Sequence, residues 1–169
     1  MDGIEVQSKS NKFENTIQNV IFTVNELSPK QADGELTASK LTIGFDKEGL
    51  EVLNPKALVA IKALQQKTGS DLYDRLVSAY EQEAPRFIEL LNQAASSRAS
   101  EDLRKAAHAL KSSSVNLGVV RVTAICKRLE DMGRTNALEQ VAPWLVLLAR
   151  EYQLACAALK NESLEVPVQ

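Results

Sequence analysis

The sequence contains a single histidine, His108, so any chemistry that requires an imidazole must use this residue. The two cysteines, Cys126 and Cys156, do not have the spacing of metal ligands, and with one histidine they cannot complete a zinc site. Glycine-rich phosphate-binding motifs are absent, and no serine and acid are spaced to form a triad with His108. These observations argue against zinc enzymes, triad hydrolases and nucleotide-binding α/β folds.

His108 lies in residues 103–118, whose pattern predicts an amphipathic helix. On a wheel of about 100° per residue, the apolar and small residues gather on one side. This predicted core side consists of Leu103, Ala106, Leu110, Ser113, Ser114 and Leu117. The other side consists of Arg104, Lys105, His108, Lys111, Ser112 and Val115. His108 is therefore predicted to face solvent or a partner, in the company of three cations.

An exposed histidine among cations suits one particular chemistry. A lone histidine is most often a structural residue, but the core side of this helix is already filled by other side chains. Neutral imidazole is a nucleophile near neutral pH, because its unperturbed pKa is about 6.5. Nearby cations favour a transferred phosphoryl group, and small neighbours let another protein approach. The wheel alone leaves both a structural and a phosphoryl-accepting role open.

The segment from His108 to Gly118 resembles the signature of histidine-containing phosphotransfer (HPt) domains. The family pattern is His-x-Leu-Lys-Gly-Ser-Ser-x-x-Leu-Gly, and this chain has His-Ala-Leu-Lys-Ser-Ser-Ser-Val-Asn-Leu-Gly. Residues 126–134 are similar to the family's next helix, Cys-x-x-Leu-Glu-x-x-Gly-Arg. The likeness includes the two alanines before His108 and the Asn-Pro at Asn54, and it spans about residues 53–160.

The resemblance implies a phosphorelay intermediate. His108 would accept a phosphoryl group from the phospho-aspartate of a response-regulator receiver domain and pass it to, or back to, another receiver aspartate. Lys111 would steady the phosphoryl oxygens, Glu130 would accept a hydrogen bond from the imidazole, and Arg134 matches a cationic position near the site. The receiver would supply Mg²⁺, so the resemblance implies no cofactor on this chain.

Ser112 departs from the family pattern, which has glycine one turn after the histidine. A serine adds a hydroxyl and slight bulk where receiver loops would approach. We expect transfer to persist, with an altered preference among partners. Ser112 and Val115, the one aliphatic residue on the His108 side of the helix, are the expected docking contacts.

Two other functions compete with this one. The dimerisation region of a sensor kinase usually has an acidic residue after its histidine, whereas Ala109 follows here and ATP-binding motifs are absent. The intact pair of His108 and Lys111 argues against a non-phosphorylated helical bundle that docks receiver or kinase domains, since such a bundle would be expected to have lost the histidine. The chain is therefore predicted to be a phosphocarrier without autonomous catalysis, either free-standing or part of a hybrid sensor kinase.

Length and composition suit a small helical protein. The 169 residues carry a net charge of −2, so no strongly basic surface suggests nucleic-acid binding. The N-terminus lacks the pattern of a signal peptide, and no apolar run is long enough to cross a membrane. We expect a cytoplasmic monomer without direct membrane contact, or the cytoplasmic end of a membrane-bound hybrid kinase.

Capping residues and helix breakers predict five helices around His108. They span residues 54–69, 71–94, 100–118, 120–133 and 136–159. Pro85 predicts a kink or break in the second helix, and Gly133 predicts the end of the fourth. Asn136 is expected to begin the last helix, with its first turn set apart by Pro143.

Apolar stripes indicate which faces are buried. The second helix would bury Leu72, Leu76, Ala79, Phe87, Leu90 and Ala94. The last helix would bury Leu138, Val141, Leu145, Leu148, Tyr152, Ala155 and Leu159. Cys126 is expected in the core.

The predicted fold is all-α. It is an antiparallel up-down-up-down four-helix bundle with a short capping N-terminal helix, preceded by an irregular extension. Residues 1–50 are predicted to be a linker or extension, 51–162 the bundle, and 163–169 a disordered tail.

Overall fold

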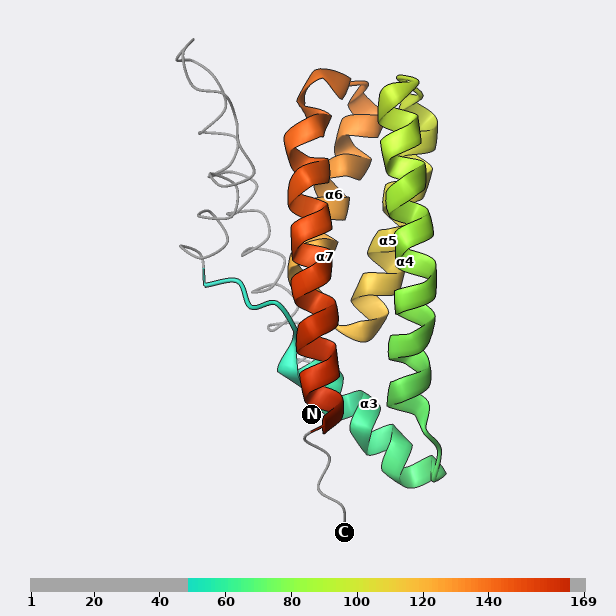
Figure 1. Cartoon of the computed structure of the whole chain (residues 1–169), viewed down its shortest axis with the longest axis vertical. Helices are drawn as coiled ribbons and strands as arrows, with labels where there is room; N and C mark the ends of the chain where they lie inside the picture. The colour runs from blue at the N-terminus through green and yellow to red at the C-terminus, as the bar shows by residue number, and fades with distance from the viewer. Residues whose placement is uncertain (1–48, 165–169) are drawn as a thin grey trace, which may run out of the picture. The chain divides into compact units, whose positions relative to one another are not determined.

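The structure, a computed structural model, describes residues 49–164. Its helices are α3 (Pro55–Thr68), α4 (Leu72–Ser96), α5 (Ser100–Leu117), α6 (Val120–Thr135), the 3₁₀ turn η1 (Leu138–Gln140) and α7 (Val141–Leu164). The four long helices run alternately up and down, α4 and α6 each packing against α5 and α7, and α3 lies across one end (Figure 1). This confirms the predicted all-α bundle with a capping helix.

The described helices belong to the unit that begins at Glu51. α7 continues through Ser163 and Leu164, two residues beyond the predicted end of the bundle. The interpretations of residues 1–48 as an extension and of residues 165–169 as a tail fall outside the described residues. No helix in the described range is long and apolar enough to cross a membrane.

The capping helix α3 begins and ends as predicted. The Asn54 side chain accepts a hydrogen bond from the Lys56 N–H at 3.1 Å, and Pro55 occupies the first helical position. Gly69 ends the helix in the left-handed conformation, with φ 63°. The segment before α3 is tied to the α5–α6 junction, because the Asn54 N–H donates to the Gly118 carbonyl at 2.8 Å.

The predicted buried face of α4 is wrong except at Ala94. Leu72, Leu76 and Phe87 are half-buried, while Ala79 and Leu90 are exposed. The face that packs into the core consists of Tyr73, Val77, Tyr80, Ala84, Leu91 and Ala94. This true stripe has the same three-four spacing, but two of its positions are tyrosines whose hydroxyls find partners in the interior.

The break expected at Pro85 does not occur, since α4 is continuous from Leu72 to Ser96. Proline has no N–H, so the Glu81 carbonyl one turn earlier loses its helical partner. The Tyr152 hydroxyl of α7 donates to that carbonyl at 3.4 Å. The hydrogen bond lost within α4 is thus replaced by one between helices.

The end of α6 also differs from the prediction. Gly133 lies inside the helix, which continues to Thr135. Asn136 ends α6 in the left-handed conformation, with φ 57°, and does not begin the next helix. η1 follows as the separate turn that Pro143 predicts, and α7 begins at Val141.

The inward faces of α5, α6 and α7 supply the rest of the core. All the predicted core residues of α5 are buried except Ser113, which is half-buried. On α7, Leu145 and Tyr152 are half-buried, and the rest of the predicted stripe is buried. Trp144 and Leu147 of α7 are also fully withdrawn from solvent, although the predicted stripe does not include them.

Candidate functional site

His108 lies near the middle of α5 and points out of the bundle, as predicted. Its side chain is 58% exposed, while its neighbours Ala107 and Leu110 are fully buried. The imidazole is therefore carried by a helix whose opposite side is fixed in the core. This leaves the ring accessible to a second protein.

Glu130 of α6 contacts the imidazole directly. Its side chain is only 11% exposed, and Oε1 lies 2.9 Å from Nδ1 of His108. An ionised carboxylate can only accept a hydrogen bond, so Nδ1 must carry the proton in this contact. Nε2 is then the unprotonated nitrogen of the neutral ring, and its lone pair is available for a reaction.

Lys111 completes the His108–Glu130–Lys111 cluster, in which its ammonium donates to Oε2 of Glu130. Burial raises the pKa of the Glu130 carboxyl, but the hydrogen bonds from Lys111 and His108 outweigh this, and the pKa lies below its usual value. Glu130 is therefore ionised at neutral pH. The cluster brings together three of the residues that the sequence singles out.

Close packing between α5 and α6 makes this contact possible. A Cβ atom at Gly133 would lie 2.7 Å from the Ser100 carbonyl oxygen and 2.8 Å from the Arg104 nitrogen. Only glycine allows α6 to approach the first turns of α5 so closely. Sequence reasoning missed this role, although a glycine inside a helical apolar pattern is a signal of close packing.

Arg134 is exposed and pairs with Asp131 at 2.5 Å, rather than joining the cluster. Arg104, one turn before His108, is bidentate to Glu101 at 2.7 and 2.9 Å. Hydrogen bonding to Glu101, and more weakly the charge of Glu130, raise the pKa of Arg104. Arg104, one of the three cations on the His108 side of the helix, is therefore committed to Glu101 and does not join the cluster.

Ser112, which replaces the family's glycine, directs its hydroxyl to the backbone. Ser112 Oγ donates to the His108 carbonyl at 3.0 Å, within the same helix. Val115, one turn further along, is 54% exposed. Both residues share the outer face of α5 with His108.

Two buried hydroxyl groups link the core side of α5 to α4. The Ser114 hydroxyl donates to the Leu110 carbonyl at 2.8 Å and lies 2.9 Å from the Tyr80 hydroxyl of α4. Sequence reasoning assigned Ser114 to packing but did not assign Tyr80 to the core.

Cys126 is fully buried as expected, and burial raises the pKa of its thiol.

No group of three His, Cys, Asp or Glu side chains in the described part of the chain could hold a metal ion.

Comparison with known proteins identifies the kind of domain. The family model described as "Hpt domain" matches residues 75–162, just over half of the chain. No curated protein sequence matches. The crystal structure of histidine-containing phosphotransfer protein B (HptB) from Pseudomonas aeruginosa PAO1 is similar, with a TM-score of 0.61 and 22% identity over 70% of this chain and 99% of that one.

Proposed function

This chain belongs to the Hpt domain family, whose members are phosphocarriers in two-component phosphorelays, and we propose that His108 is its phosphoryl acceptor. One observation carries the proposal: Nδ1 of the exposed His108 imidazole is held by the Glu130 carboxylate, 2.9 Å away. This contact selects the tautomer whose Nε2 lone pair is directed away from Glu130. The chain has no second histidine that could accept the group instead.

In the proposed transfer, Nε2 of His108 attacks the phosphorus of a receiver's aspartyl phosphate. The N–P bond forms as the P–O bond to the aspartate breaks, and the aspartate leaves with the electron pair as a free carboxylate. The proton on Nδ1 stays in place, so the phosphorylated ring carries a positive charge that Glu130 balances. Reversing these steps returns the phosphoryl group to a receiver.

Lys111 would act on the phosphoryl oxygens. Its side chain is 27% exposed and reaches Glu130 from one turn beyond His108. A phosphoryl group on Nε2 brings additional negative charge to the same place, and the flexible ammonium can turn towards it. Arg104 and Arg134 would contribute only to the positive field, since each already pairs with a neighbouring acid.

The receiver domain would approach over Ser112 and Val115, beside His108. It would bring its own Mg²⁺ and acidic pocket, and the carrier would bring the nucleophile. The chain would act as a monomer in the cytoplasm, and would need a kinase elsewhere to introduce the phosphoryl group into the relay.

A transfer assay tests the proposal. The protein is mixed with purified receiver domains from the same organism, each phosphorylated on its aspartate with ³²P in the presence of Mg²⁺. We expect acid-labile, alkali-stable label on the chain within seconds with at least one receiver, and none after incubation with Mg²⁺ and ATP alone. His108→Ala should abolish the label, whereas Asn116→Ala, at another exposed position of α5, should retain it. Label that persists in His108→Ala, or no transfer from any receiver, would overturn the proposal.

A further inference from the structure

A single carboxylate of α5 engages two of the three cations on the His108 side of the helix. Glu101 accepts bidentate hydrogen bonds from Arg104 at 2.7 and 2.9 Å, and its Oε1 atom lies 3.8 Å from the Lys105 ammonium. The hydrogen bonds from Arg104 hold the pKa of the Glu101 carboxyl below its usual value, so this group is ionised at neutral pH. Both cations therefore already have a carboxylate partner before any phosphoryl group is present.

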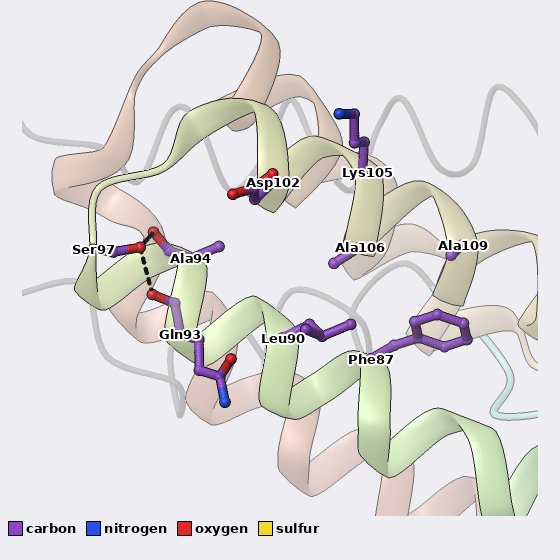
Figure 2. Close-up of a pocket in the computed structure, with 9 residues that line it drawn as sticks. All are labelled: Phe87, Leu90, Gln93, Ala94, Ser97, Asp102, Lys105, Ala106 and Ala109. Atoms are coloured by element: carbon purple, nitrogen blue, oxygen red, sulfur yellow. Dashed lines mark hydrogen bonds between the residues drawn. The ribbon is translucent and has the colours of Figure 1, made fainter.

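These two cations stand close to the candidate phosphoryl acceptor. Arg104 and Lys105 precede His108 by about one helical turn. Side chains of a helix lean towards its N-terminus, so we expect the imidazole to lie over the turn that begins at Arg104. Figure 2 shows Lys105 pointing away from α4, on the outer side of α5. Either side chain could therefore turn towards a phosphoryl group on His108 if Glu101 did not engage it.

The third cation, Lys111, is engaged differently, because its carboxylate partner is Glu130 of α6. Glu130 also holds the imidazole, so Lys111 belongs to the cluster. Arg104 lies within the electrostatic reach of this cluster, since Glu101 and, more weakly, the charge of Glu130 raise the pKa of its guanidinium. Its hydrogen bonds nevertheless go to Glu101, which leaves Lys111 as the cation that is held at the imidazole.

We propose that Glu101 is a positioning residue that limits how tightly the carrier holds its phosphoryl group, because it keeps Arg104 and Lys105 engaged elsewhere. This inference rests on the proposed function of His108. A guanidinium binds phosphate with the same fork of donors that Glu101 occupies here. Without Glu101, that fork would form charge-assisted hydrogen bonds to the phosphorylated imidazole and stabilise the phosphorylated carrier. A relay intermediate must give the group up to a second aspartate, so weaker holding favours onward transfer.

The transfer equilibrium tests this role of Glu101. The carrier is mixed with a ³²P-labelled receiver whose aspartyl phosphate outlives the measurement, at concentrations well below the Kd of the complex. Once the distribution of label is constant, the equilibrium constant reports how strongly each protein holds the phosphoryl group, not how tightly the two proteins dock. We expect Glu101→Gln to shift this constant towards the phosphorylated carrier by about 3- to 10-fold.

Glu139→Gln is the matched control. It removes the same charge from another exposed pair of an acid and an arginine, in which Arg98 precedes the start of α5. The equilibrium constant of this variant should stay within about twofold of the wild-type value, because the freed arginine is not beside His108. Circular dichroism spectra confirm that each variant is folded.

A double variant identifies the cation that responds. Glu101→Gln combined with Arg104→Gln removes both members of the pair, so the equilibrium constant should return to within about twofold of wild type. A constant about threefold or more below wild type would show that Arg104 binds the phosphoryl group even while Glu101 is present, and would overturn the proposal. A constant as high as that of Glu101→Gln would support the proposal through Lys105 alone.

The outcomes separate this proposal from the one on which it rests. Equal constants for wild type and Glu101→Gln, with transfer to His108 intact, would reject the role of Glu101 and leave the proposed function standing. If no receiver transfers its label to the wild-type chain, or if the label persists in His108→Ala, both proposals fail.

Discussion

α5 packs against its two neighbours in different ways. On the α6 side, Gly133 brings the backbones into close contact, and Glu130 reaches His108 from the next turn. On the α4 side, the buried Tyr80–Ser114 contact closes only the C-terminal half of the interface, and a groove remains beside the N-terminal half. The same helix is therefore packed tightly on the side where Glu130 contacts the imidazole and less completely covered on the side of α4.

This difference suggests a division of labour in a small carrier. Orientation of the imidazole depends on a carboxylate that is mostly buried and paired, because a mobile surface side chain would not select one tautomer. Under the proposed function, recognition of a receiver falls to the exposed side chains beside His108, such as Val115. The predictions below test each side separately.

The largest effect should come from Glu130→Ala. It removes the acceptor for the Nδ1 proton, so both tautomers and several ring orientations become populated. We expect the transfer rate from a phosphorylated receiver to fall by about 10- to 100-fold. Glu130→Gln keeps an amide oxygen that can accept the hydrogen bond from the Nδ1–H and should lose less, about 3- to 10-fold. Equal rates for wild type and Glu130→Ala in rapid-quench assays would remove Glu130 from the mechanism.

The same carboxylate makes a pH-dependent contribution to stability. Its folded-state pKa lies below the usual value of 4.5, so the folded state favours the ionised form. The stabilisation is therefore complete above about pH 4.5 and is lost as the pH falls through the folded pKa. In urea titrations from pH 6 to pH 3, the stability advantage of wild type over Glu130→Gln should shrink. An advantage that stays constant would contradict the lowered pKa.

Gly133→Ala tests the tight side of α5 through its backbone. The new methyl group would press on the Ser100 carbonyl and the Arg104 backbone, so α6 must move away. We expect a loss of about 1–3 kcal/mol in the free energy of unfolding, measured with urea, because overpacking outweighs the better helix propensity of alanine. Receiver transfer should slow as Glu130 moves from His108.

Gly69→Ala is the control for this change. Gly69 has open space around it but a φ of 63°, so its substitution costs backbone strain without displacing a helix. Transfer by Gly69→Ala should equal that of wild type. If Gly133→Ala also transfers at the wild-type rate, the close contact does not position the site.

Tyr80→Phe tests the half of the α4 side that is closed. The variant loses one hydroxyl, but Ser114 keeps its hydrogen bond to the Leu110 carbonyl, so no buried donor is left without an acceptor. We expect a loss of about 1 kcal/mol in thermal unfolding, with transfer unchanged. A double-mutant cycle with Ser114→Ala should show that the two hydroxyls are coupled, and additive losses would contradict the contact.

The sequence predicts most of the fold, because its strongest signals are local. Asn54, Pro55, Gly69 and Gly118 act at helix ends, where one residue determines the backbone conformation. The face of α4 could not be predicted in the same way, since Tyr73 and Tyr80 are buried only because distant atoms satisfy their hydroxyls. Pro85 is tolerated for a similar reason, through Tyr152 of α7.

The candidate site, like the fold, has features that the sequence predicts and features that it does not. The outward direction of His108 follows from the pattern of its own helix. The proximity of Glu130 does not, because 22 residues separate it from His108, and only the family resemblance pointed to it. Gly133 and the α4–α5 groove depend on how two helices pack, which no single helical pattern contains.

The smallest predicted effect concerns the turn between α4 and α5. Arg98, which follows Ser97 in the α4–α5 connection, has a φ of 56°, a conformation that favours glycine. Arg98→Gly and Arg98→Ala both lose the exposed ion pair with Glu139, but only glycine relieves the backbone strain. Arg98→Gly should therefore be more stable than Arg98→Ala by about 0.5–1 kcal/mol in urea unfolding, and both should bind receivers as wild type does. If Arg98→Ala were the more stable variant, the backbone strain would not exist; if either variant lost receiver binding, this turn would contribute to the receiver contact.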